Sequence, residues 1–140
     1  YQQHQQMIEL YSMELAERTP TKLYSSSCYL PIPFNKKAIS VSIGKCLCEQ
    51  VDFPRLINTL ATQGSSLFIE MGAGRSLCTW TDKILVEQEN CMTVAVNGKG
   101  SDQQLMIARA IAKLLSFGVK MNLKSFFYGS VVVQKQKQNN

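Results

Sequence analysis

Residues 67–84 constrain the fold more than any other part of this sequence. The apolar run at 67–69 has the length and composition of a buried β-strand, and a Gly-x-Gly turn at Gly72 and Gly74 follows it. After the turn, apolar side chains recur at helical spacing, at Leu77, Trp80 and Ile84. A strand that turns directly into a helix predicts an α/β fold with a mostly parallel sheet.

The first part of the chain predicts a helix, a strand and a loop. The helix begins close to residue 1 and ends at Thr19, because a residue before proline is pushed out of the helical region. Residues 22–26 are a candidate strand, and the prolines within 29–33 predict a loop. The apolar stripe of the helix consists of Met7, Ile8, Tyr11 and Leu15.

Two capped helices are predicted next. Asn35 and Asp52 are polar residues at positions where helices can begin, and their side chains can accept backbone N–H groups there. Pro54 is tolerated in the first turn of the second helix, and Gly64 is its expected end. The apolar face of the first helix consists of Ile39, Ile43 and Leu47.

The last part of the chain predicts a strand, a long helix and a second strand. Residues 91–96 are the first strand, and Ser101 with Gln104 forms a capping box for a helix that Gly118 ends. This helix is apolar on more than one face, which predicts deep burial. Residues 119–123 alternate between apolar and polar side chains, as a half-buried strand does.

We expect one α/β piece over residues 1–128 and a polar tail over residues 129–140. The tail is low in complexity from Gln134 onward and is predicted to be disordered. Because the chain begins with Tyr1 rather than Met, we also expect it to be part of a longer protein.

The net charge of +5 and the pI near 9.0 make the chain mildly basic. The basic residues, Arg75 and Arg109 among them, are scattered without interleaved aromatics, so nucleic-acid binding is not predicted. Mild basicity suits a phosphorylated ligand or an acidic protein partner. The sequence contains neither a run of about twenty apolar residues nor a signal-peptide pattern, which predicts a cytoplasmic protein without a membrane span.

The cysteines and the histidine do not form a complete catalytic or metal centre. Five cysteines, mostly within apolar segments, predict free and partly buried thiols in a reducing compartment. The pair Cys46 and Cys48 lacks the second ligand pair that zinc needs, so no metal site is predicted. His4, the single histidine, stands among glutamines and is expected to be an exposed surface residue. No Gly-x-Ser-x-Gly nucleophile elbow occurs.

Glu70, Gly72 and Gly74 allow two interpretations. A strand, an acidic residue and Gly-x-Gly before a helix could hold a ligand at the helix N-terminus, as in S-adenosylmethionine-dependent methyltransferases. However, Ser76 replaces the third glycine of such a motif, and the next strand ends in Asn97 rather than in an acidic residue. The sequence therefore favours a tight strand-to-helix turn, with S-adenosylmethionine binding as the alternative.

Four segments together indicate a family. Residues 49–53 are similar to a Pro-Val-x-Trp/Phe step into a helix, and residues 68–74 to a Glu-Val-Gly-Pro-Gly strand and turn. The other two segments are 23–27, after the first helix, and 117–123. In this order they resemble the C-terminal part of an acyl-CoA:acyl carrier protein acyltransferase domain of fatty acid and polyketide synthases. The departures are Gln50 and Ala73, both of which replace prolines.

The amino-acid sequences of segments 24–29, 48–53 and 78–83 are most similar to that of one branch of this family. That branch is the acyltransferase subunit of bacterial omega-3 polyunsaturated fatty acid synthases. The resemblance implies ping-pong transfer from acyl-CoA to the thiol of a phosphopantetheinyl acyl carrier protein, without a bound cofactor. It places the serine nucleophile and the histidine base upstream, so the chain alone is expected to be inactive. It also implies that the main-chain carbonyl of Cys46, or of a neighbouring residue, orients that histidine.

The resemblance implies acyl carrier protein and other synthase subunits as partners. A different alternative also stays open: a non-catalytic docking module that contacts a carrier protein and has no serine elbow in its parent chain. The sequence does not indicate which acyl chain would be transferred.

Overall fold

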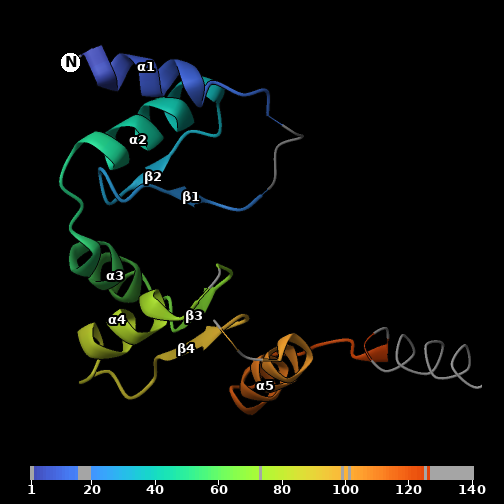
Figure 1. The fold of residues 1–140 in the computed structure, drawn as a ribbon. Coiled ribbons are helices and arrows are strands. Elements are labelled where there is room, and N and C mark those ends of the chain that lie inside the picture. Colours follow the sequence, from blue (N-terminus) through green and yellow to red (C-terminus); the bar gives the residue numbers. More distant parts are fainter. Residues whose placement is uncertain are drawn as a thin grey trace, which may run out of the picture. The chain divides into compact units, whose positions relative to one another are not determined.

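The computed structural model describes residues 2–15, 20–72, 74–98, 100, 102–124 and 126 (Figure 1). Its helices are α1 (Gln2–Leu10), α2 (Lys36–Cys48), α3 (Phe53–Thr62), α4 (Ser76–Ile84) and α5 (Gln103–Ser116). Its strands are β1 (Leu23–Tyr24), β2 (Pro31–Ile32), β3 (Leu67–Glu70) and β4 (Met92–Ala95). The antiparallel pair β1–β2 and the parallel pair β3–β4 are two separate sheets. Helices and strands are thus mixed, which is compatible with the predicted α/β class.

The chain divides into two compact units. Unit 1 comprises residues 1–67 and 79–91, and unit 2 comprises residues 68–78 and 92–140. Each unit has buried side chains of its own. Those of unit 1 are Ser25, Ser40, Ile57, Thr81 and Leu85, and those of unit 2 are Cys78, Thr93, Val94 and Ala110.

In unit 1, α2 lies between α1 and the β1–β2 hairpin (Figure 1). The buried residues of α2 are Ser40 and Gly44, whereas Leu47 is 57% exposed. A Cβ atom at Gly44 would lie only 2.9 Å from Ile8 Cγ1 of α1. The predicted apolar stripe is therefore not the most buried face of α2, because a small-residue face allows the closer approach between helix backbones.

The predicted helix caps at Asn35 and Asp52 are confirmed. Asn35 Oδ1 accepts the Ala38 N–H at 2.8 Å, and Asp52 Oδ1 accepts the Arg55 N–H at 3.0 Å. Each bond satisfies one of the N–H groups that a helix start leaves without an intrahelical acceptor. Gly64, with φ of 94°, follows the end of α3 as predicted.

The ends of α5 show one correction and one confirmation. Asp102 is its N-cap and accepts the Leu105 N–H at 3.0 Å, in place of the predicted Ser101, which lies outside the described residues. Gly118 ends the helix as predicted, with φ of 88°. Its N–H donates to the Leu115 carbonyl, and the Val119 N–H donates to the Leu114 carbonyl, as in a Schellman motif.

Two predictions for the first 33 residues are wrong. The loop at 29–33 contains β2, which pairs Ile32 with Leu23 and Pro31 with Tyr24. Proline is tolerated here because a two-stranded sheet consists of edge strands alone. The first helix ends at Leu10, well before Thr19, which lies outside the described residues. Beyond Leu10 the apolar side chains are exposed, and a helix without tertiary packing is marginal in water.

Burial on β3, α4 and α5 also differs from expectation. On α4, Leu77 and Trp80 are about half exposed, and Cys78 is buried instead. On β3, Ile69 is 45% exposed, because β4 is the one strand with which β3 pairs within the described residues. The buried residue of α5 is Ala110, and the predicted strand at 119–123 has no strand pairing within the described part of the chain.

The predicted tail at 129–140 lies outside the described residues. Within the described residues, no helix has both the length and the apolar character that crossing a membrane requires.

Candidate functional site

Cys46 lies in the last turn of α2. A helix leaves its last carbonyls without intrahelical donors, and the Glu49 N–H closes α2 by donating to the Lys45 carbonyl at 2.8 Å. The Cys46 carbonyl comes one residue later, at the negative end of the helix dipole. A carbonyl in such a position can accept the N–H of an imidazole and thereby fix its tautomer.

The side chain of Cys46 belongs to a group of hydroxyl and thiol side chains, here called the serine cluster: Ser25, Ser26, Ser27, Ser42 and Cys46. Cys46 Sγ lies 3.1 Å from Ser26 Oγ. Ser25 Oγ, which is buried, lies 2.8 Å from Ser27 Oγ and 2.5 Å from Ser42 Oγ. The cluster joins the hairpin turn to α2. It contains no base that could deprotonate a hydroxyl, so by itself it does not supply an activated nucleophile.

Tyr29 fixes the segment that connects α2 to α3. It has a positive φ of 61°, and its hydroxyl accepts the Asp52 N–H at 3.1 Å. The Arg55 guanidinium carbon lies 4.4 Å from the centre of the Tyr29 ring, which is within the range of a cation–π contact. Tyr29, in the hairpin turn, thus anchors the segment 49–53, whose sequence resembles the acyltransferase family.

Glu70 holds the start of α4 in unit 2. Its Oε2 accepts the Cys78 N–H at 2.8 Å, and its main-chain carbonyl accepts the Val96 N–H at 3.1 Å. A carboxylate at the positive N-terminus of a helix is favourable both as a hydrogen-bond acceptor and as a charge. Glu70 therefore links the end of β3 to the beginning of α4 and to the residue after β4.

Gly72 and Gly74 form the turn between β3 and α4. Gly74 has φ of 151° and donates its N–H to the Gly72 carbonyl at 3.0 Å. A Cβ atom on Gly72 would meet nothing within 4 Å, so the backbone requires glycine at Gly74 and not at Gly72. Because the Glu70 carboxylate already occupies the N-terminus of α4, the geometry argues for a structural turn rather than for anion binding at that point.

We expect Cys78 to be the slowest cysteine to react with a thiol reagent at pH 8. Burial raises the pKa of the Cys78 thiol, and the Glu70 carboxylate raises it further, against a smaller opposing effect of the Thr93 hydrogen bond. Cys28 and Cys48 are exposed and should react first. Mass-resolved labelling with iodoacetamide would measure this order, and fast labelling of Cys78 in the folded chain would contradict it.

The same pKa shift predicts a loss of stability at alkaline pH. The Cys78 thiol holds its proton more tightly in the folded chain than in the unfolded one. The contribution of this thiol to the free energy of unfolding is therefore complete at pH values below its pKa in the unfolded chain. The free energy of unfolding should fall as pH rises beyond that value towards the folded pKa. Denaturant titrations across this range, with Cys78→Ser as the control that lacks the effect, would test the sign.

His4 is half-buried, and the prediction of an exposed surface residue is wrong. It lies where α1 approaches Gly44, with its Cδ2 3.3 Å from the position that a Cβ of Gly44 would take. Its Nε2 is buried and has no hydrogen-bond partner among the described residues. The structure therefore does not join His4 to a nucleophile.

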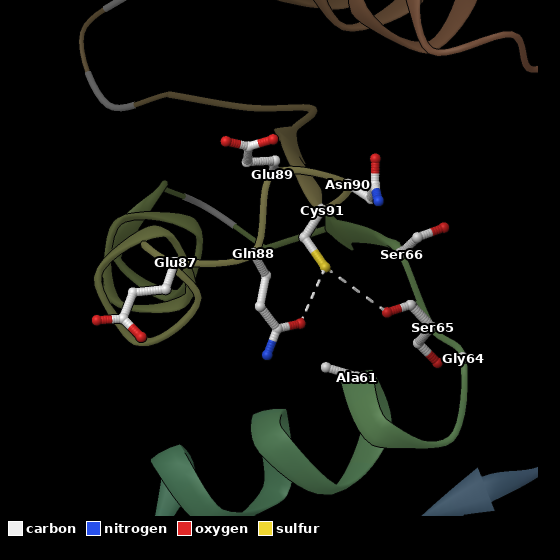
Figure 2. A pocket seen from close by; sticks show the side chains of 9 residues that line it. All are labelled: Ala61, Gly64, Ser65, Ser66, Glu87, Gln88, Glu89, Asn90 and Cys91. Atoms are coloured by element: carbon white, nitrogen blue, oxygen red, sulfur yellow. Dashed lines mark hydrogen bonds between the residues drawn. The ribbon is translucent and has the colours of Figure 1, made fainter.

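A pocket of about 470 Å³ lies in unit 1 beside the end of α3 (Figure 2). Figure 2 shows Gln88 and Cys91 pointing toward each other, with 3.5 Å between the Cys91 sulfur and Gln88 Oε1. The same sulfur lies 4.0 Å from the Ser65 carbonyl oxygen. Glu87 and Glu89 make this region acidic, and the nine residues that line the pocket include no basic side chain. It offers hydrogen-bonding groups but no acid–base pair.

Sequence reasoning missed a grouping of cations in unit 2. Arg75, Arg109 and Lys113 line one small cavity, although the basic residues look scattered along the chain. Arg109 and Lys113 are four residues apart on α5, a spacing that places them on one helix face. Within the described residues, no group of three or more metal-ligating side chains occurs.

No family model matches this chain, and searches of curated proteins and of solved structures found no similar protein. The functional interpretation therefore depends on the residues and on the geometry described above.

Proposed function

We propose that this chain is the C-terminal part of an acyltransferase domain that moves acyl groups from CoA to an acyl carrier protein. In this proposal, the chain is a parallel-sheet fragment of the hydrolase-like lobe of that domain. The parent protein is a cytoplasmic synthase of polyunsaturated fatty acids. The main partners are acyl carrier protein and the other synthase subunits.

The observation that supports this proposal most directly is the position of Cys46. The proposal needs a main-chain carbonyl shortly before the 49–53 segment, accessible to an imidazole N–H. Cys46 lies in the last turn of α2, after the carbonyl that Glu49 uses. Tyr29, through Asp52, anchors the segment that follows α2. A main-chain group in a fixed place can orient a ring without depending on the side chain that carries it.

In the proposed reaction, the oxygen of an upstream serine attacks the thioester carbonyl of acyl-CoA. The histidine accepts the serine proton and returns it to the departing CoA thiolate, which leaves an acyl-serine ester. The thiol of the carrier protein then attacks this ester and releases the serine. The contribution of the present chain is structural, because Cys46 would hold the imidazole and Glu70 would hold the start of α4.

The test begins with the coding sequence upstream of the Tyr1 codon and continues with the full-length protein. We expect a Gly-x-Ser-x-Gly elbow, a histidine shortly before Tyr1, and an acyl mass on that serine after incubation with acyl-CoA. The 140-residue chain alone should gain no acyl group. The Cys46→Ala variant of the full-length protein should acylate within about twofold of the wild type, because a carbonyl is retained and the lost hydrogen bond is a weak one.

Two results would contradict the proposal. One is an upstream sequence without the serine and the histidine, which would favour the carrier-docking alternative. The other is an acyl adduct on the 140-residue chain itself, which would place the nucleophile within this segment.

A further inference from the structure

A cavity of about 130 Å³ in unit 2 brings three cations together. One wall comes from the start of α4, one from β4 and one from α5, so three elements of this unit contribute to it. Its lining consists of Arg75, Cys78, Thr93, Ala95, Met106, Arg109, Ala110 and Lys113.

The lining is divided between a buried floor and charged side chains at the rim. Cys78, Thr93 and Ala110 are buried, whereas Arg109 and Lys113 are exposed residues of α5. On α5 the lining residues recur at steps of three and four, which places them on the face toward the cavity. A recess with a small, buried floor and long cationic side chains around its opening can enclose a compact anion.

The charge balance at the cavity is positive. Neither Arg109 nor Lys113 forms an ion pair within the described part of the chain, so their charges are not neutralised by a neighbouring carboxylate. Glu70 contacts one lining residue, through the Cys78 amide, but does not itself line the cavity. Arg109 and Lys113 thus bring two positive charges to the recess, with the Glu70 carboxylate beside it.

We propose that this cavity binds a phosphate group of an organic phosphate ligand. Guanidinium groups match the tetrahedral oxygens of phosphate with paired N–H donors, and a lysine adds a point charge. The volume admits one phosphate and not a complete nucleotide, so the remainder of the ligand would lie outside. The choice of CoA as that ligand rests on the proposed function, whereas the phosphate site does not.

The test is isothermal titration of the 140-residue chain with CoA, dephospho-CoA and pyrophosphate. We expect Arg109→Gln and Lys113→Gln each to weaken binding about tenfold, since a hydrogen bond to a charged group is worth at least this factor. The double variant should abolish detectable binding. The control variant Lys36→Gln/Lys45→Gln removes the same charge from α2, outside the cavity, and should bind as the wild type does.

The three ligands identify the phosphate that binds. Weaker binding of dephospho-CoA than of CoA assigns the 3′-phosphate, and equal binding of the two assigns the diphosphate. Binding of pyrophosphate but of neither CoA nor dephospho-CoA supports the phosphate site and rejects CoA as its ligand. The proposed function is tested separately, by acyl loading of the full-length protein. The proposal is overturned if none of the three binds, or if the control variant loses as much affinity as the cavity double variant.

Discussion

Replacing Gly44 by leucine should detach α1 from α2 and lower the free energy of unfolding by about 2–3 kcal/mol. The Cβ alone would lie 2.9 Å from Ile8 Cγ1 and 3.3 Å from His4 Cδ2, and the rest of a leucine side chain has no space there. Leucine is a better helix former than glycine by roughly 0.8 kcal/mol, so the steric effect must outweigh a local gain. Urea denaturation would measure the net loss, and hydrogen exchange of the α1 amides would locate it.

Two further variants make this prediction specific to the helix contact. Lys37→Leu places the same side chain on an exposed position of α2 and should change stability by less than about 0.5 kcal/mol. Ile8→Ala in the Gly44→Leu background opens space opposite the new side chain and should recover part of the loss. Unchanged protection of the α1 amides in Gly44→Leu would show that α1 does not depend on this contact.

Replacing Glu70 by alanine should destabilise the start of α4 by about 1–2 kcal/mol. The variant leaves the buried Cys78 without its acceptor, so an N–H group in the first turn of α4 loses its hydrogen bond. Glu70→Gln keeps a carbonyl oxygen in about the same place and should lose less than half as much. Chemical denaturation and amide exchange at α4 would measure both changes.

The control for this series is Glu87→Ala, which removes an exposed carboxylate from unit 1 and should be nearly neutral. If Glu70→Gln were as damaging as Glu70→Ala, the charge rather than the accepted hydrogen bond would hold the helix start. If Glu70→Ala left α4 exchange unchanged, the capping role would be wrong.

The elements that the sequence predicts correctly are those decided by local chemistry. Asn35 and Asp52 start helices because their own side chains bond backbone groups three residues ahead. Gly118 ends α5 because the left-handed backbone there suits glycine. Such interactions need no knowledge of distant residues, which explains why a pattern within a few positions is sufficient to find them.

The elements that the sequence predicts wrongly depend on what lies opposite them. An apolar stripe does not become buried where the described residues offer too little surface to cover it, as Leu105 on α5 shows with an exposure of 48%. Conversely, Gly44 is buried although it has no apolar side chain to signal it. Helix faces are settled by tertiary contacts, and these are not encoded in the helix's own periodicity.

The candidate site shows the same division. The turn through Gly72 and Gly74 depends on neighbouring residues alone, and the sequence predicts both its position and that it leads from a strand into a helix. The cavity is not local, because Arg75 and Arg109 are 34 positions apart and meet only through the packing of α5 against β4. The i, i+4 spacing of Arg109 and Lys113 on α5 can be read from the sequence, whereas their proximity to Arg75, the residue before α4, cannot.

The contacts of Tyr24 and Tyr29 in the hairpin bear on the order in which the elements of unit 1 fold. Tyr29 bonds to Asp52, 23 residues away, and Tyr24 bonds to Gln63, 39 residues away. Strands of two residues do not hold together in isolation, and closing a long loop has an entropic cost before any contact is gained. The hairpin should therefore form late, after α2 and α3 have provided the groups to which it bonds, and should be the first part of unit 1 to melt.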